Sequence, residues 1–153
     1  MIDGVKLIRL TRHVDDRGFL MEILRSDDAH FIRFGQAYVT TCDPQPGGPV
    51  VKAWHKHAKQ TDHFCALRGK VKVGLYDDRD DSPTKGQSQT IVLGDGNDFL
   101  VQIPPGVWHG YMPLGFETVC ILNLPTETYD RENPDEQRAP WDAFPVKWQV
   151  ESR

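Results

Sequence analysis

The chain has 153 residues, of which 39% are hydrophobic and 26% charged, and its formal net charge is −4. This length is typical of one compact domain, so we expect residues 1–153 to form a single domain. Positive and negative residues are interspersed, and no basic patch for nucleic acid or an anionic membrane is predicted. Residues 1–10 lack a long apolar run, so neither a signal peptide nor a membrane span is expected.

The three cysteines, Cys42, Cys65 and Cys120, are odd in number and far apart. They form no C-x-x-C motif, a pattern that favours free thiols in a reducing compartment. We therefore predict a cytoplasmic protein whose cysteines are buried or incidental rather than redox-active.

Short segments with strand character follow one another along the chain, separated by turn residues. In chain order, strands are predicted at residues 5–10, 19–24, 36–41, 50–57, 63–67, 70–76, 90–93, 99–103 and 119–124. Turn-forming clusters lie at residues 15–18 and 43–49, and the charged segment 77–89 is predicted to be an exposed loop. Many short strands with Gly/Pro turns indicate an all-β sandwich or barrel rather than a parallel α/β fold.

The end of the chain is polar and contains prolines. Residues 132–137 have the composition for one short turn of helix. Further on, Trp141, Phe144 and Trp148 are large apolar side chains, and we expect them to pin this tail to the body of the protein.

Two segments carry the chemistry. The first, residues 54–62, contains His55, His57 and Asp62; the second, residues 104–109, is Pro-Pro-Gly-Val-Trp-His and ends at His109. Side chains two apart on a strand share a face, so the first two histidines are expected to project together. The order H-x-H, carboxylate, P-x-G-x-x-H resembles the two signature motifs of the cupin superfamily. This resemblance implies a cupin jelly-roll β-sandwich or barrel with little helix.

Histidines beside a carboxylate permit two kinds of chemistry. Imidazoles and an aspartate suit a divalent transition metal such as Fe, Mn, Ni, Cu or Zn. They also suit metal-free acid–base catalysis, because histidine titrates near neutrality and a carboxylate orients its ring. A purely structural, hydrogen-bonded cluster inside the barrel is the remaining alternative. His63 neighbours Asp62 on a strand and is predicted to be a packing or surface histidine rather than a site member.

A more specific resemblance is to the dTDP-4-dehydrorhamnose 3,5-epimerase family of the cupins. The similar segments are residues 15–22, 52–55, 67–71, 78–84, 103–111 and 141–142. In these, Asp-Asp-Arg-Gly-Phe-Leu-Met-Glu is similar to the family's D-x-R-G-x-F/L-x-E, and Lys-Ala-Trp-His stands where the family has R-G-L-H. The His55-Lys56-His57 pattern and the Pro105–His109 segment also resemble the dTDP-sugar 3,4-ketoisomerases.

Four departures from the epimerase pattern are visible. Lys52 replaces the arginine before the base, and Asp62 stands where the family has a lysine. Asn123 lies near the position of the family's tyrosine acid, with Tyr129 a few residues on. No counterpart of the aspartate that the family places behind its base is identified.

The resemblance implies an isomerase or epimerase that acts on a nucleotide-linked 4-keto-6-deoxy sugar through an enolate and uses no cofactor. His55 would be the base, His57 or His109 would shuttle a proton or stabilise charge, and Tyr76 or Tyr111 would be the acid. The side chains predicted to bind the nucleotide diphosphate, partly across a homodimer interface, are Arg17, Glu22, Lys52 and Lys59.

Two other functions stay open on the sequence. The first is a metal-dependent cupin enzyme, an oxygenase or isomerase, that holds one divalent transition metal through His55, His57, Asp62 and His109. The second is a non-catalytic module that binds a sugar nucleotide, which the missing acid and missing aspartate favour.

Overall fold

The computed structural model of the protein describes residues 1–45 and 50–150. These residues form two five-stranded antiparallel sheets and a separate two-stranded hairpin, with no helix among them. The strands are β1 (Lys6–Arg9), β2 (His13–Asp15), β3 (Gly18–Leu20), β4 (Tyr38–Cys42), β5 (Lys52–Lys56), β6 (Asp62–Arg68), β7 (Lys70–Asp77), β8 (Ser88–Leu93), β9 (Phe99–Ile103), β10 (Val107–Leu114), β11 (Val119–Asn123) and β12 (Gln137–Arg138). The predicted all-β sandwich is confirmed.

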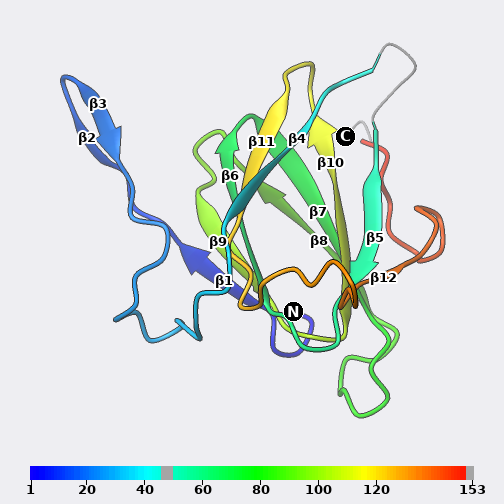
Figure 1. Ribbon diagram of the computed structural model, residues 1–153. Coiled ribbons are helices and arrows are strands. Elements are labelled where there is room, and N and C mark those ends of the chain that lie inside the picture. Colours follow the sequence, from blue (N-terminus) through cyan, green and yellow to red (C-terminus); the bar gives the residue numbers. More distant parts are fainter. Residues whose placement is uncertain (46–49, 151–153) are drawn as a thin grey trace.

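The two sheets pack face to face (Figure 1). The first has the strand order β1-β9-β6-β11-β4 and the second β12-β5-β10-β7-β8. Alternation in β7 places Val71, Val73 and Leu75 in the core, where each is 0% exposed. Because successive side chains of a strand point to opposite faces, this pattern fixes which face of the sheet turns inward.

Strand β10 is missing from the sequence prediction, although it is the middle strand of the second sheet. It pairs with β7 along its whole length and with β5 at His109 and Tyr111. Gly110 lies between these two residues, and a Cβ built there would come within 2.2 Å of the Cβ of Ala53. The glycine therefore allows β5 and β10 to approach closely enough to bring their histidines together.

The N-terminal region differs from its prediction in one respect. The predicted turn at residues 15–18 is a hairpin turn between β2 and β3, but the strand predicted at 19–24 ends at Leu20. The hairpin stands away from the two sheets (Figure 1). Of the predicted breaker cluster 43–49, residues 46–49 lie outside the described residues.

The predicted helical turn at residues 132–137 is wrong, because this segment leads instead into β12, which pairs with β5. The expectation that the tail is pinned to the body holds. Trp148 is 5% exposed and packs on Trp54, with ring centroids 5.2 Å apart, and Phe144 contacts Trp54 edge-on at 5.3 Å. Trp141 itself is 56% exposed, and its carbonyl accepts hydrogen bonds from both buried tryptophans.

No helix suited to crossing a bilayer is found in residues 1–45 and 50–150. All three cysteines are free thiols.

Candidate active site

A cavity of about 750 Å³ opens between the edges of the two sheets. The second sheet contributes Lys52, His55 and His109 to its wall, and the first contributes Tyr38 and Thr40. Residues just before and within β12 close one side of it. The two predicted motifs therefore meet at a single cavity, where β10 places His109 directly opposite His55 in the strand register.

His55 is the histidine most open to this cavity, and a carboxylate holds it in place. Its Nδ1 lies 2.6 Å from Oε1 of Glu136, which is 15% exposed. Since a carboxylate only accepts, Nδ1 carries the hydrogen and the Nε2 lone pair is free to take a proton. No hydrogen bond to Nε2 is formed within the described part of the chain.

The electrostatics of this pair suit a base that is neutral at physiological pH. Burial lowers the pKa of His55 below its usual value, and the hydrogen bond to Glu136 partly opposes this. Burial acts to raise the pKa of Glu136, but hydrogen bonds from Arg138 and His55 outweigh it and leave that pKa lowered. Glu136 is therefore ionised when His55 accepts a proton.

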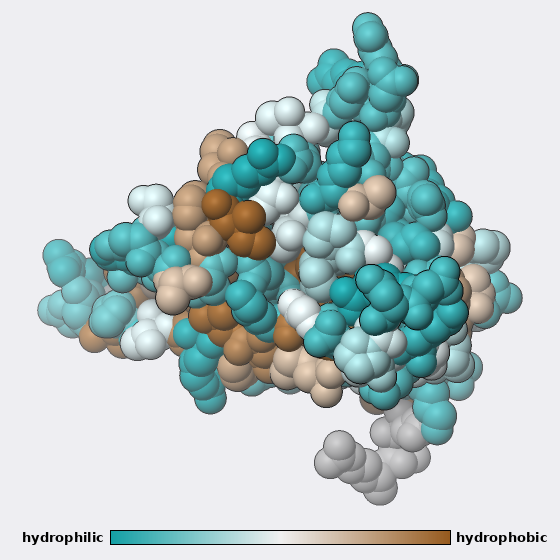
Figure 2. All heavy atoms as spheres, turned by 90° about the horizontal axis from the view of Figure 1, so that it is seen from below, coloured by the Kyte–Doolittle hydropathy of each residue, from teal (hydrophilic) through white to brown (hydrophobic). Residues whose placement is uncertain are grey.

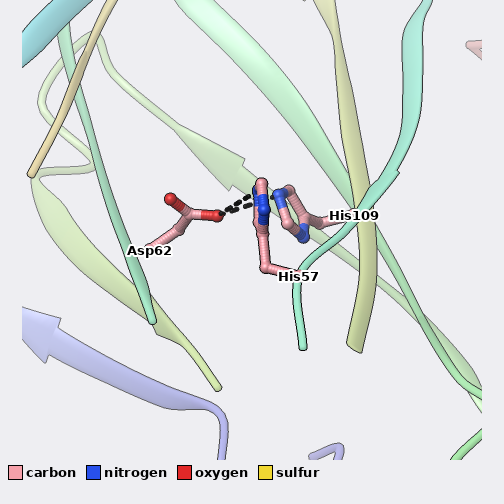
Figure 3. Close-up of side chains that lie close together, drawn as sticks. All are labelled: His57, Asp62 and His109. Atoms are coloured by element: carbon pink, nitrogen blue, oxygen red, sulfur yellow. Dashed lines mark ion pairs between the residues drawn. The ribbon is translucent and has the colours of Figure 1, made fainter. Parts of the chain in front are cut away.

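His57 and His109 lie deeper and share a second carboxylate, Asp62 (Figure 3). Oδ2 of Asp62 is 3.3 Å from Nε2 of His57 and 3.1 Å from Nε2 of His109. The opposite ring nitrogens donate to backbone carbonyls, Nδ1 of His57 to Asp135 and Nδ1 of His109 to Val107. Both imidazoles thus have partners at both nitrogens, unlike His55.

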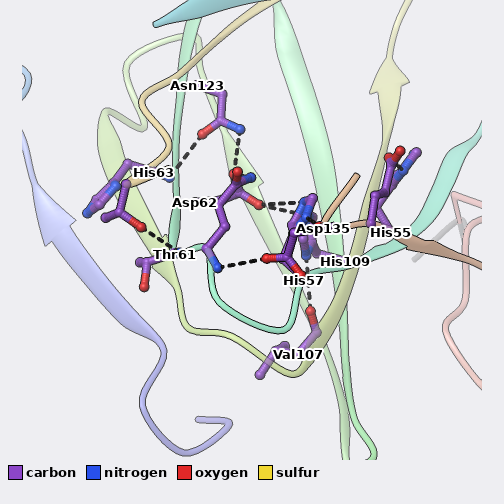
Figure 4. A network of polar contacts seen from close by, with 12 residues as sticks. His55, His57, Thr61, Asp62, His63, Val107, His109, Asn123 and Asp135 are labelled. Atoms are coloured by element: carbon purple, nitrogen blue, oxygen red, sulfur yellow. Dashed lines mark hydrogen bonds and ion pairs between the residues drawn. The ribbon is translucent and has the colours of Figure 1, made fainter. Parts of the chain in front are cut away.

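Asp62 is 1% exposed and is satisfied on its other oxygen as well (Figure 4). Its Oδ1 accepts hydrogen bonds from Gln60 at 2.8 Å and from Asn123 at 2.7 Å. Burial acts to raise the pKa of Asp62, but the hydrogen bond and charge of His109, followed by His57, leave it lowered. A buried carboxylate with this many donors is a fixed negative charge behind the cavity wall.

These three residues can hold a metal ion. One ligand atom from each of His57, Asp62 and His109 lies within 4.8 Å of the others. Because Nδ1 of each histidine donates to a carbonyl, Nε2, which here faces Asp62, would be the nitrogen that binds a metal. His55 is not part of this group, because its ring is turned to Glu136; the predicted set of four ligands becomes a set of three.

The segment before β12 organises the whole site and was not identified from the sequence. Asp135 accepts backbone hydrogen bonds from Ala58, Lys59 and Gln60 at 2.9, 2.8 and 3.2 Å, and its carbonyl accepts from His57. The next residue, Glu136, supplies the carboxylate behind His55. The adjacent acidic residues Asp135 and Glu136, in a polar segment, were the one sequence signal that pointed to this part of the chain.

The tyrosines divide between cavity and core. Tyr111 lines the cavity, and its hydroxyl bonds to Thr40 at 2.8 Å. Tyr76 does not line it: its ring stacks on Phe144 at 4.3 Å, because the polar face of β7 is covered by the C-terminal tail. Tyr38, absent from the sequence prediction, lines the cavity from the first sheet.

The predicted diphosphate-binding residues are also separated. Lys52 lines the cavity, whereas Lys59 lies outside its wall with its backbone held by Asp135. Arg17 is on the projecting hairpin and pairs with Asp15, and Glu22 pairs with Arg25. A further cation, Arg138, lines the cavity and bonds to Glu136 at 2.9 Å.

His63 is fully buried, as its predicted packing role requires. Its Nδ1 donates to the carbonyl of Leu124 at 2.7 Å, and Gln102 donates to its Nε2 at 2.9 Å. Both ring nitrogens are used in the interior, on the far side of the strand from Asp62.

Comparisons with known proteins identify the family of this chain. The whole chain, residues 1–153, matches the family described as dTDP-4-dehydrorhamnose 3,5-epimerase. The probable low-salt glycan biosynthesis epimerase Agl13 of Haloferax volcanii is 42% identical over 143 residues, 92% of this chain and 89% of Agl13. The spore coat polysaccharide biosynthesis protein SpsL of Bacillus subtilis is 43% identical over 155 residues, 100% of both chains. A solved dTDP sugar isomerase from Desulfovibrio desulfuricans G20 has a TM-score of 0.88 and 32% identity, covering 96% of this chain and 92% of that one.

The family match and the relatives show that this protein, an all-β sandwich, is a nucleotide-sugar epimerase. This chain belongs to the dTDP-4-dehydrorhamnose 3,5-epimerase family. One of the two motives for the non-catalytic alternative, the missing carboxylate, is removed, since Glu136 lies behind His55.

Proposed function

We propose that this protein epimerises a dTDP-linked 4-keto-6-deoxyhexose at the carbons beside its ketone, with His55 as the base. The observation that carries the proposal is the 2.6 Å contact between Nδ1 of His55 and Glu136, which leaves Nε2 free at the cavity. The family to which the chain belongs supports the choice of substrate.

The chemistry needs no cofactor. A C–H bond next to a ketone is acidic because its electron pair can move onto the carbonyl oxygen and form an enolate. Nε2 of His55 accepts the proton, and the resulting imidazolium is stabilised by ionised Glu136. Return of a proton to the same carbon restores the ketone, and its arrival on the other face inverts the centre.

Positive charge for the diphosphate comes from Lys52 and Arg138. Both line the cavity: Arg138 is the cross-strand partner of His55 on β12, and Lys52 lies at the start of β5, the strand that carries His55. The Arg138 side chain is 72% exposed and uses Nη2 for Glu136. A guanidinium has five donors, so its remaining edge can bind phosphate oxygens while the ion pair is kept.

We further propose a homodimer in which the hairpin reaches the partner subunit. Several large apolar side chains are exposed on the hairpin, on the segment that follows it and on β4: Val14, Phe19, Leu20, Ile32, Phe34 and Val39. Apolar surface gathers on part of the face seen in Figure 2, among otherwise hydrophilic residues. Such patches mark association surfaces. Arg17 and Glu22, remote from the cavity of their own chain, would then serve the neighbouring one.

The proposal includes a cytoplasmic location. The free thiols of Cys42, Cys65 and Cys120 support it, because reduced cysteines are usual in that compartment.

A metal-dependent isomerase is the second candidate. His57, Asp62 and His109 have donor types and orientations that fit a divalent transition metal. A bound metal would supply Lewis-acid stabilisation of the ketone oxygen, while His55 and Glu136 would keep their places. Metal analysis of the purified protein separates the two. Stoichiometric metal that disappears in His57→Ala would favour this candidate, and a folded, active, metal-free protein would exclude it.

The test of the first proposal is incubation with dTDP-4-keto-6-deoxyglucose in deuterated buffer, followed by NMR of the sugar. We expect deuterium at C3 or C5 together with an inverted centre. A substrate that binds and stays unlabelled would contradict the proposal.

A further inference from the structure

Inversion at a carbon requires a proton donor on the face opposite to the base. We propose that Tyr38 is this acid and that it protonates the enolate on the face remote from His55. The inference rests on the proposed epimerisation and adds the second proton-transfer residue to it.

The two residues lie on opposite walls of the same cavity. Tyr38 begins β4, an edge strand of the first sheet, whereas His55 is on β5 in the second sheet. Both line the cavity. A sugar ring bound between the walls would present one face to the imidazole and the other to the phenol.

The hydroxyl of Tyr38 is oriented by Asn123, its cross-strand partner on β11. Oδ1 of Asn123 accepts from the backbone N–H of His63 at 3.0 Å, so the amide nitrogen must face the other way. That nitrogen donates to Asp62 at 2.7 Å and to the Tyr38 oxygen at 2.8 Å (Figure 4 shows Asn123 beside Asp62). The phenol oxygen is therefore an acceptor in this bond, and its own hydrogen has no acceptor among the described residues.

The protonation state fits the role. Burial, followed by the charge of Asp62, raises the pKa of Tyr38 to about 12, which keeps the phenol protonated at neutral pH. When its O–H bond breaks, the proton goes to carbon and the electron pair stays on the phenol oxygen. The hydrogen bond donated by Asn123 then stabilises the phenolate. His55 holds the proton removed earlier, and exchange with solvent returns both groups to their starting states.

The other tyrosines are less well placed. Tyr111 is on β10, in the same sheet as His55, and its hydroxyl is engaged with Thr40. Tyr76 is stacked on Phe144 outside the cavity wall. Tyr129 also lines the cavity and is 51% exposed, against 43% for Tyr38, but its hydroxyl has no hydrogen-bond partner among the described residues to orient it.

The test separates proton removal from inversion by measuring both in deuterated buffer. In Tyr38→Phe, His55 can still remove the proton and return deuterium to the same face. We expect exchange at C3 or C5 to stay within a few-fold of wild type while epimer formation falls roughly 100-fold or more. Tyr76→Phe is the matched control and should keep both rates, and Tyr111→Phe should keep the wild-type ratio of exchange to inversion.

Tyr38→Phe with normal inversion would overturn the assignment. So would the loss of exchange and inversion together, because a pure acid is not needed for proton removal. Absence of exchange in the wild-type protein would instead count against the proposed epimerisation itself.

Discussion

Replacing Glu136 by glutamine removes the charge behind His55 while keeping the size of the side chain. The carboxylate is 15% exposed, and its charge strengthens the 2.6 Å hydrogen bond that Nδ1 of His55 donates to it. Charge-assisted hydrogen bonds contribute about 1.5–3 kcal/mol. If that energy is realised in the transition state, where His55 becomes an imidazolium, the rate falls roughly 10- to 150-fold in Glu136→Gln.

The same substitution has a pH signature. Burial lowers the pKa of His55, and Glu136 partly restores it, so Glu136→Gln should lower that pKa further. The acidic limb of kcat/KM then moves to lower pH while the plateau drops. The assay is the rate of C3 and C5 deuterium exchange measured across pH. Glu132→Gln is the control, because that exposed residue lies on the same segment outside the cavity wall. A Glu136→Gln rate within twofold of wild type, or a limb that moves to higher pH, would refute the reasoning.

Three further predictions concern the wild-type pH profile and two buried carboxylates. Because burial lowers the pKa of His55 from 6.5, the acidic limb of kcat/KM should be centred below that pH; a limb centred above 6.5 would contradict the assignment of the base. Asp62→Asn replaces a buried carboxylate, which only accepts hydrogen bonds, with an amide that also donates. We expect urea titration to show a decrease of about 3 kcal/mol in the free energy of unfolding. An unchanged urea midpoint would argue against a stabilising role for the hydrogen bonds and ion pairs around Asp62. Asp77 is fully buried and accepts hydrogen bonds from three side chains of the following loop, led by Arg79, which lower its pKa. Its contribution to stability is therefore present above the ordinary aspartate value of 3.8 and disappears as pH falls toward the folded-state pKa. Asp77→Asn should cost about 2–4 kcal/mol at pH 7 and flatten the acid dependence seen in thermal unfolding.

Strands that are either mainly apolar or alternate apolar and polar residues could be predicted from the sequence. Residues 99–103 are β9 as predicted, and residues 70–76 differ from β7 by one residue. Strand β10 was missed because Gly110 and Pro113 are strand breakers by composition. The structure accommodates the glycine where β5 approaches closely, and Pro113 lies beyond Tyr111, the last residue paired with β5.

The histidines of the site could be predicted because short motifs carry them. His55 and His57 follow the H-x-H spacing, and the Pro-Gly turn precedes His109. Glu136 could not be found this way, because it lies 81 positions from His55 and no motif surrounds it. Only the pairing of β12 with β5 brings this carboxylate to the ring.

Asp62 shows that a residue's position in the sequence does not reveal its partners in the fold. The sequence showed a carboxylate where the family has a lysine, but not what surrounds it. The structure places it behind the cavity wall, between two imidazoles and two amides, rather than among the residues that line the cavity. The charge of Asp62 alone therefore did not distinguish a structural, a catalytic and a metal-binding role.

The central claim is that His55 removes the proton that begins epimerisation. His55→Asn keeps a hydrogen-bonding group near Glu136 but has no basic nitrogen. The direct measurement compares this variant with wild type for dTDP binding by calorimetry and for deuterium exchange at C3 and C5. We expect dTDP affinity within a few-fold of wild type and exchange reduced roughly 1,000-fold or more. Exchange at the wild-type rate in His55→Asn would contradict the claim.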